Sequence, residues 1–148
     1  MYYKSPQSIV LVTLQLILLF SLFSVGPTYP SNFFSFLFIT VGLVLGSWSV
    51  LTMSSRSKIN VFPDVLPDSQ LVTAGPYKYI RHPMYTSLIF ISLGLFLNDF
   101  SIIRLILTLL LSWLLIYKIK LEEDYLSQIF SDYRNYCTHT HRLIPWIF

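Results

Sequence analysis

Two clusters of residues in this chain of 148 residues combine side-chain types that could carry chemistry. The first runs from Gly75 to Tyr85 and holds three tyrosines, two basic residues and a histidine. The second runs from Lys118 to Asp124 and places two lysines ahead of the acidic run Glu-Glu-Asp. Together they supply cations, carboxylates, an imidazole and aromatic rings. Such a set suits a ligand that carries both charges and an aromatic ring.

The basic cluster has the form of a helix start. Pro83 fits the first turn of a helix, where its missing N–H leaves no hydrogen bond unmade. Arg81 and His82 would then lie at the helix N-terminus, whose free N–H groups favour an anion. A plainer interpretation is also open. Arg81 would then contact lipid head groups, His82 would be a structural hydrogen bonder and the tyrosines would be interfacial aromatics.

The acidic cluster is predicted to lie on an amphipathic helix. At about 100° per residue, Glu122 falls at the centre of the apolar face, Glu123 at its edge and Asp124 points away. That face is formed by Leu126, Ile129, Phe130 and Tyr133. Burying a carboxylate there is unfavourable unless it is paired or binds a ligand. Lys118, four residues earlier, is the ordinary structural partner for Glu122.

The elements that must position these clusters are apolar helices. The chain is 54% hydrophobic and 11% charged, whereas a soluble domain is about a quarter charged. Four apolar stretches cover residues 8–25, 33–53, 83–97 and 102–117. The first two have about the 20 residues that cross a bilayer as helix, and the last two are shorter. We predict an all-α polytopic membrane protein with about four transmembrane helices, as two hairpins, plus a C-terminal amphipathic helix.

The basic residues predict the orientation of these spans. Of the ten lysines and arginines, only Arg104 falls on the far side of a four-helix threading. We therefore expect both termini, the loop 54–82 and the active site to be cytoplasmic. The first stretch should remain as a span rather than be cleaved as a signal peptide, because it is long and further spans follow.

The spans divide a single membrane domain, 1–148, into three parts. We expect an N-terminal helical hairpin (1–53), a cytoplasmic loop (54–82) and a C-terminal hairpin with its tail (83–148). The basic cluster opens the third span, and the acidic cluster closes the fourth. Because a helical hairpin brings those two ends to the same face of the membrane, we expect the two clusters to form one site.

Several other kinds of site lack their usual sequence signals. Cys137 is the only cysteine, and His139 and His141 are spaced i, i+2, so we expect no metal site. The chain has neither the Gly-x-Gly-x-x-Gly of a Rossmann dinucleotide site nor a Gly-x-Ser-x-Gly nucleophile turn. The net charge is +3, but the basic residues are scattered, so we expect no nucleic-acid partner.

The order and spacing of these motifs resemble those of a family of membrane methyltransferases. Residues 71–85 are similar to the Gly-Pro-Tyr…Arg-His-Pro-x-Tyr signature of isoprenylcysteine carboxyl methyltransferases and related phospholipid N-methyltransferases. Residues 118–123 resemble that family's basic-x-basic-x-Glu-Glu motif, with lysines where the family tends to have arginines. The tail matches at Leu126, Phe130, Tyr133, Tyr136 and the run 142–145. The resemblance covers roughly residues 71–146.

The resemblance implies an enzyme that uses S-adenosyl-L-methionine, bound at the cytoplasmic end of the last hairpin. Cofactor contacts are implied for Gly75, Pro76, Tyr77, His82, Pro83, Tyr85 and Glu122. Catalytic roles fall to Arg81, Glu123 and Arg142. The arginines, with Lys118, would hold a carboxylate acceptor, and Glu123 would serve as the base for an amine acceptor. The acceptor would be lipophilic and reached from the membrane lipids, either an isoprenylcysteine carboxylate or a phospholipid amine.

Two other functions stay open on the sequence alone. Sterol and steroid reductases, which use NADPH, share an Arg-His-Pro-Asn-Tyr element, although Met84 takes the place of the asparagine here. The other is a non-catalytic membrane protein of the same fold. The presence of both clusters in one chain favours an enzyme over that last alternative.

Overall fold

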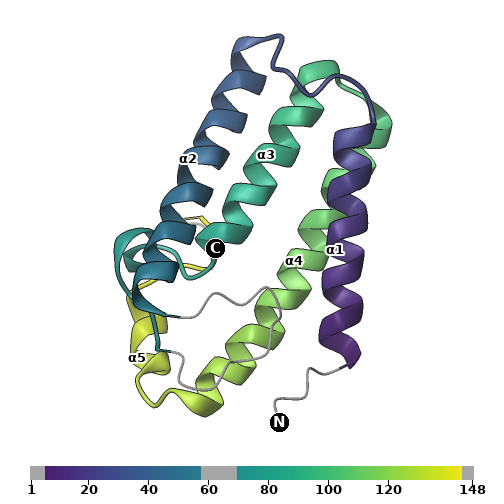
Figure 1. The fold of residues 1–148 in the computed structure, drawn as a ribbon. Helices are drawn as coiled ribbons and strands as arrows, with labels where there is room; N and C mark the ends of the chain where they lie inside the picture. Colours follow the sequence, from purple (N-terminus) through teal and green to yellow (C-terminus); the bar gives the residue numbers. More distant parts are fainter. Residues whose placement is uncertain (1–5, 58–69, 145–148) are drawn as a thin grey trace.

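The residues that the structure describes fold as a bundle of four long helices with a short helix at one end (Figure 1). The computed structural model describes residues 6–57 and 70–144. These ranges contain α1 (Pro6–Ser24), α2 (Phe33–Arg56), the 3₁₀ helix η1 (Gly75–Lys78), α3 (Pro83–Asp99), α4 (Ile102–Ile129) and α5 (Tyr133–Thr138). Part of the predicted loop 54–82, and residue 145 of the predicted tail motif, lie outside the described residues.

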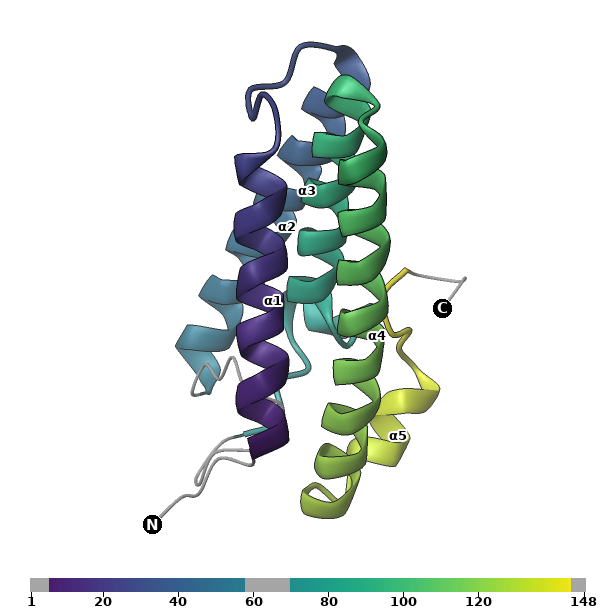
Figure 2. The ribbon, with the colours of Figure 1, turned by 90° about the vertical axis from the view of Figure 1, so that its right-hand side faces the viewer.

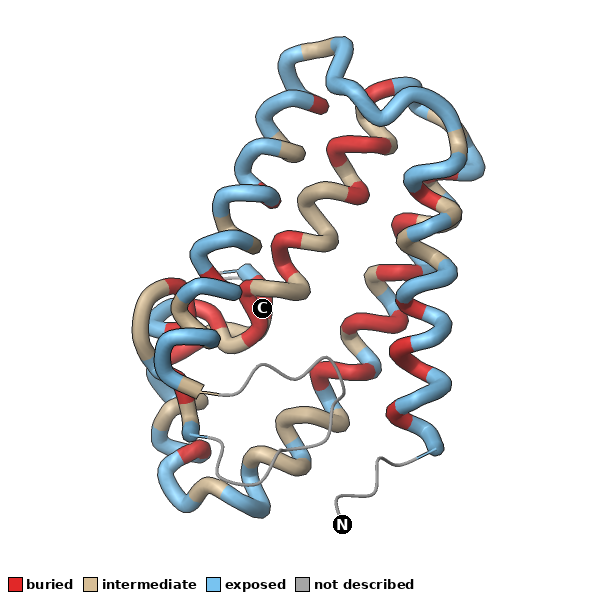
Figure 3. The backbone as a smooth tube through the Cα atoms, in the orientation of Figure 1, coloured by how far each residue is buried: buried red, intermediate tan, exposed pale blue. Residues whose placement is uncertain are grey.

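Three of the long helices have the length and composition of membrane spans. Within the described ranges, α1, α2 and α4 are long and apolar enough to cross a bilayer. α3 has 17 residues, or about 25 Å of helix, and packs against both α2 and α4. Large apolar side chains such as Phe20, Leu43 and Trp113 are exposed. Figure 3 colours the exposed positions along these helices pale blue. The predicted all-α polytopic membrane architecture is confirmed.

The helices do not pack as two separate hairpins. α1 and α2 are joined by a chain reversal, but α2 packs mainly on α3, and α1 packs on α4. In Figure 1 the order across the bundle is α2, α3, α4 and α1, and Figure 2 shows α1 beside α4. The first and last spans in the sequence are therefore neighbours in space.

Small residues let α2 and α3 approach closely. A Cβ added to Gly42 in α2 would lie 2.9 Å from the backbone oxygen of Ser87 in α3. A Cβ on Gly94 in α3 would lie 3.0 Å from the backbone nitrogen of Ile39. Gly46 faces the side chain of Ser87 in the same way. Close contact of this kind is how helices associate in lipid, where burial of apolar surface supplies no driving force.

A polar network fixes the end of the bundle that lies away from the two clusters. The Asn98 side-chain nitrogen donates to the carbonyls of Pro27 at 3.1 Å and Tyr29 at 2.9 Å, which anchors the turn between α1 and α2. Arg104 is fully buried, donates to the Pro27 carbonyl at 2.9 Å and lies 3.1 Å from the Asp99 carboxylate. Arg104, the one basic residue that the sequence places on the far side of the membrane, therefore has a structural role.

The close α2–α3 contact leads to a stability prediction. Gly42→Val should lower the free energy of unfolding by about 1–3 kcal/mol, as overpacking does elsewhere, because the added methyl groups meet the Ser87 carbonyl. Val44→Leu is the control, because Val44 is 63% exposed. Thermal unfolding in detergent micelles measures both variants. Equal melting temperatures for wild type and Gly42→Val would contradict the close contact.

Candidate active site

The C-terminal tail runs beside the segment that leads into α3. A parallel bridge pairs Ile80 with His141. The amide of Arg81 donates to the His141 carbonyl at 2.7 Å, and the amide of His82 donates to the Arg142 carbonyl at 3.1 Å. These backbone hydrogen bonds hold the tail against the start of α3. A reversal of the chain between α3 and α4 does not by itself predict this contact.

Glu123 in α4 holds two arginines, one from each of these segments. The Arg81 Nε donates to its Oε1 at 2.8 Å, and the Arg142 Nε donates to its Oε2 at 2.8 Å. The Arg81 Nη1 also donates to the Thr140 carbonyl and, at 3.3 Å, to the Cys137 carbonyl. Only 10% of the Arg81 side chain and 11% of the Glu123 side chain are exposed. The pair is therefore largely shielded from water.

Glu122 forms a second set of contacts with the first residues of α3. The Tyr85 hydroxyl donates to Glu122 Oε1. His82 lies between the two carboxylates, with Nδ1 3.4 Å from Glu122 and Nε2 3.5 Å from Glu123. The His82 and Tyr85 rings stack at 5.8 Å between centroids. Burial lowers the pKa of His82, but the contacts with Glu122 and Glu123 outweigh it and leave that pKa raised, which favours an imidazolium.

Lys118 extends the site toward α1. Its side chain is fully buried, and its Nζ donates to Gln15 Oε1 at 2.7 Å. The same ammonium lies 5.1 Å from the centroid of the Tyr85 ring. Glu122, the partner that the sequence predicts for Lys118, also interacts with it electrostatically. Gln15 was missed by the sequence reasoning, and the available signal was a lone amide in the apolar stretch 8–25.

The turn that contains Gly75 and Tyr77 packs between α2 and the acidic cluster. Gly75 has a φ of +59°, and a Cβ there would lie 2.7 Å from the Thr52 Oγ1 of α2. Tyr77 is buried, and its carbonyl accepts a hydrogen bond from the Tyr136 hydroxyl at 2.6 Å. Burial raises the pKa of Tyr77, and Tyr136 and Glu122 raise it further, so the phenol stays protonated.

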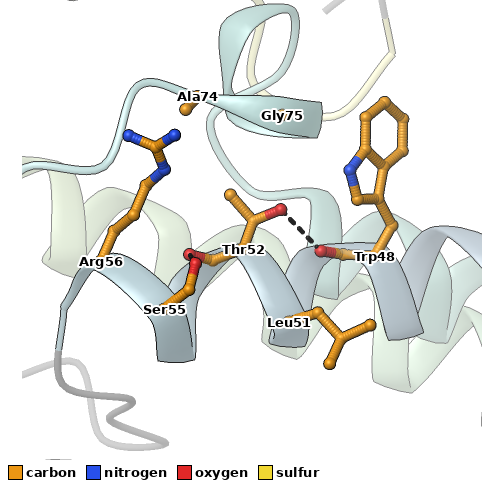
Figure 4. A pocket seen from close by; sticks show the side chains of 7 residues that line it. All are labelled: Trp48, Leu51, Thr52, Ser55, Arg56, Ala74 and Gly75. Carbon is orange, nitrogen blue, oxygen red and sulfur yellow. Dashed lines mark hydrogen bonds between the residues drawn. The ribbon is translucent and has the colours of Figure 1, made fainter.

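An open groove of about 340 Å³ lies beside this turn (Figure 4). It is lined by Trp48, Leu51, Thr52, Ser55, Arg56, Ala74 and Gly75. The Thr52 and Ser55 hydroxyls donate to backbone carbonyls one turn earlier in α2, so toward a ligand they act as acceptors. Arg56 supplies charged donors, and Trp48 supplies an indole N–H. The groove therefore combines one cation, polar side chains and apolar surface.

Six of the ten predicted site residues form one cluster. These are Arg81, His82, Tyr85, Glu122, Glu123 and Arg142. Pro83 is buried at the first turn of α3, while Gly75, Pro76 and Tyr77 form the neighbouring turn. Their individual roles stay predictions. In the described ranges, no three His, Cys, Asp or Glu side chains are placed to hold a metal ion.

Comparison with protein families gives a match. Residues 30–133 match the family model PEMT, described as phospholipid methyltransferase. No curated protein matches the chain. The matched segment includes both clusters of the site, but it leaves out α1 and the tail that carries Arg142.

The two bonds of Glu123 give a prediction about the tail. Glu123→Gln should speed hydrogen exchange at the amides of Arg81 and His82 by about tenfold or more, because removing one charge of a buried pair is strongly destabilising. Asp124→Asn is the matched control, because Asp124 is exposed on the same helix. Hydrogen exchange followed by mass spectrometry measures both variants. Unchanged protection in Glu123→Gln would mean that the backbone bridge holds the tail without the ion pairs.

Proposed function

The chain belongs to the phospholipid methyltransferase family, and we propose that it transfers a methyl group from S-adenosyl-L-methionine to a lipophilic acceptor in the membrane. The observation that carries this proposal is the meeting of Glu122 with His82 and Tyr85 at one end of the bundle. The positive-inside pattern supports a cytoplasmic location for this end and for both termini.

The side chains of the cluster fit the chemistry of this cofactor. S-adenosyl-L-methionine carries an ammonium, a sulfonium, a carboxylate, ribose hydroxyls and an adenine ring. Glu122, with 17% of its side chain exposed, offers oxygen acceptors for an ammonium or for hydroxyls. A protonated His82 offers a donor for a carboxylate, and Tyr77 and Tyr85 add aromatic surface. When bound, the cofactor supplies an electrophilic methyl group, and alignment with the acceptor is the main requirement.

The geometry suggests different roles for the two glutamates. Both oxygens of Glu123 already accept hydrogen bonds from guanidinium groups. Such contacts stabilise the ionised form, so Glu123 would be a weak base. We assign Glu123 the positioning of Arg81 and Arg142, and we assign Glu122 the contact with the cofactor. Arg142, whose side chain is 37% exposed, can reach an anionic group of the acceptor.

The groove beside Gly75 suits the head group of a phospholipid. Arg56 can bind a phosphate, and tryptophans such as Trp48 are enriched at membrane surfaces. Leu51 continues the groove onto the apolar outer face of α2, where the lipid chains would lie. Because Arg81 already binds Glu123, Arg81 is less available to bind the carboxylate of an acceptor. We therefore favour a phospholipid amine over an isoprenylcysteine carboxylate.

Calorimetric titration of the purified protein in detergent tests the cofactor. We expect saturable binding of S-adenosyl-L-methionine, and we expect Glu122→Gln to weaken it by about tenfold or more, since a hydrogen bond to a charged group is lost. Asp124→Asn should bind like wild type. NADPH is titrated in parallel. Binding of NADPH alone would replace this proposal with a reductase, and binding of neither ligand would favour a non-catalytic protein.

Lipid extraction after incubation with methyl-labelled cofactor tests the acceptor. Label should enter a phospholipid, and Arg56→Gln should raise the acceptor KM about tenfold, as expected for a lost ionic hydrogen bond, without changing cofactor affinity. Arg134→Gln is the control, because Arg134 is exposed on α5 away from the groove. Label in an isoprenylcysteine analogue but in no phospholipid would contradict the head-group assignment. Equal KM values for the two arginine variants would mean that Arg56 does not bind the head group.

A further inference from the structure

α1 carries a buried polar residue that points at the site from outside the matched segment. Gln15 lies near the middle of this apolar helix and is 6% exposed. α1 ends at Ser24, before the family match begins at residue 30. Polar residues inside a membrane helix are unfavourable unless they are paired, and they often mark a functional contact. The partner of Gln15 is Lys118, whose Nζ donates to its Oε1 at 2.7 Å.

The contact continues from Lys118 to the acidic cluster. The Lys118 ammonium lies 5.1 Å from the centroid of the Tyr85 ring, within the range of a cation–π interaction. The Tyr85 hydroxyl in turn donates a hydrogen bond to Glu122, and the Tyr85 ring stacks on His82. A displacement of the ammonium would therefore also act on Tyr85, and through Tyr85 on Glu122, the carboxylate that we propose contacts the cofactor.

We infer that Gln15 is a positioning residue for the proposed methyltransferase, which holds Lys118 against Tyr85 and so sets the place of Glu122. The inference rests on the proposed function. Lys118 and Glu122 also attract each other electrostatically. Gln15 supplies Lys118 with an uncharged acceptor from α1. Without the Gln15 amide, the buried Lys118 ammonium would turn toward Glu122. The ammonium would then compete with the ligand for the Glu122 carboxylate.

A second glutamine on α1 separates this role from simple helix packing. The Gln7 Nε2 donates to the Tyr117 hydroxyl of α4 at 2.8 Å, and this pair is exposed. Both glutamines therefore join α1 to α4, but Gln7 does so without touching Lys118 or Tyr85. Gln15→Leu and Gln7→Leu each remove a hydrogen bond between α1 and α4, so Gln7→Leu controls for the loss of such a bond.

The two variants should differ in ligand binding. We expect Gln15→Leu to raise the KM for S-adenosyl-L-methionine about tenfold, the scale of a lost hydrogen bond to a charged group, and Gln7→Leu to change it less than about twofold, the range of an exposed pair. Gln15→Glu keeps an oxygen beside Lys118 and should restore the KM. In a Lys118→Met background, Gln15→Leu should have no further effect, because the two residues act as a unit.

A readout without ligand decides the inference separately from the proposed function. The His82 ring stacks on Tyr85, so its NMR signals report the placement of that ring. They should shift in Gln15→Leu and stay unchanged in Gln7→Leu. Equal His82 signals and equal KM values in the two variants would overturn the positioning role. If wild type fails to bind S-adenosyl-L-methionine but the His82 signals still separate the variants, the proposed function fails and the positioning of the cluster by Gln15 stands.

Discussion

The ion pairs of Glu123 hold together the end of the molecule that carries the site. Removing a charged group from water costs several kcal/mol in practice, so a shielded carboxylate needs close partners of opposite charge. Glu123 finds them in Arg81, at the start of α3, and in Arg142, in the tail. Three segments far apart in the sequence therefore meet at one residue. His82 follows Arg81 directly, and Tyr85 lies one helical turn later. Their approach to Glu122 therefore depends on the ion pair between Arg81 and Glu123.

The opposite end of the bundle meets the same physical requirement with different residues. Asn98 satisfies the carbonyls of the turn between α1 and α2, and Arg104 is buried against Asp99. Between the two ends, α2 and α3 touch through small residues that include Gly42 and Gly94. In lipid, polar groups without internal partners are strongly unfavourable. The paired polar groups at both ends fix the helices, and the site is built on that fixed frame.

Local patterns in the sequence predicted the helices and the meeting of the two clusters. Hydropathy and chain reversal can be predicted from residues that are close together in the sequence. They did not predict which glutamate binds the arginines. The amphipathic pattern placed Glu122 at the centre of the apolar face, whereas Glu123 binds both guanidinium groups because the tail returns to the start of α3. Gln15 was missed for a similar reason. Its partner Lys118 is 103 residues away, and only the packing of α1 on α4 brings them together.

The length of α4 explains why the site lies where it does. Glu122 follows Ile102 by 20 residues, which is about 30 Å of helix, close to the thickness of the hydrocarbon core. α4 continues to Ile129, so a span that begins at Ile102 would place the carboxylates near the boundary between lipid and water. Under the proposed function, a water-soluble cofactor and a lipid acceptor would both reach that depth. Buried ion pairs add little net stability compared with apolar packing, so we propose that the charges gathered at this depth serve to place a ligand as well as to join the three segments.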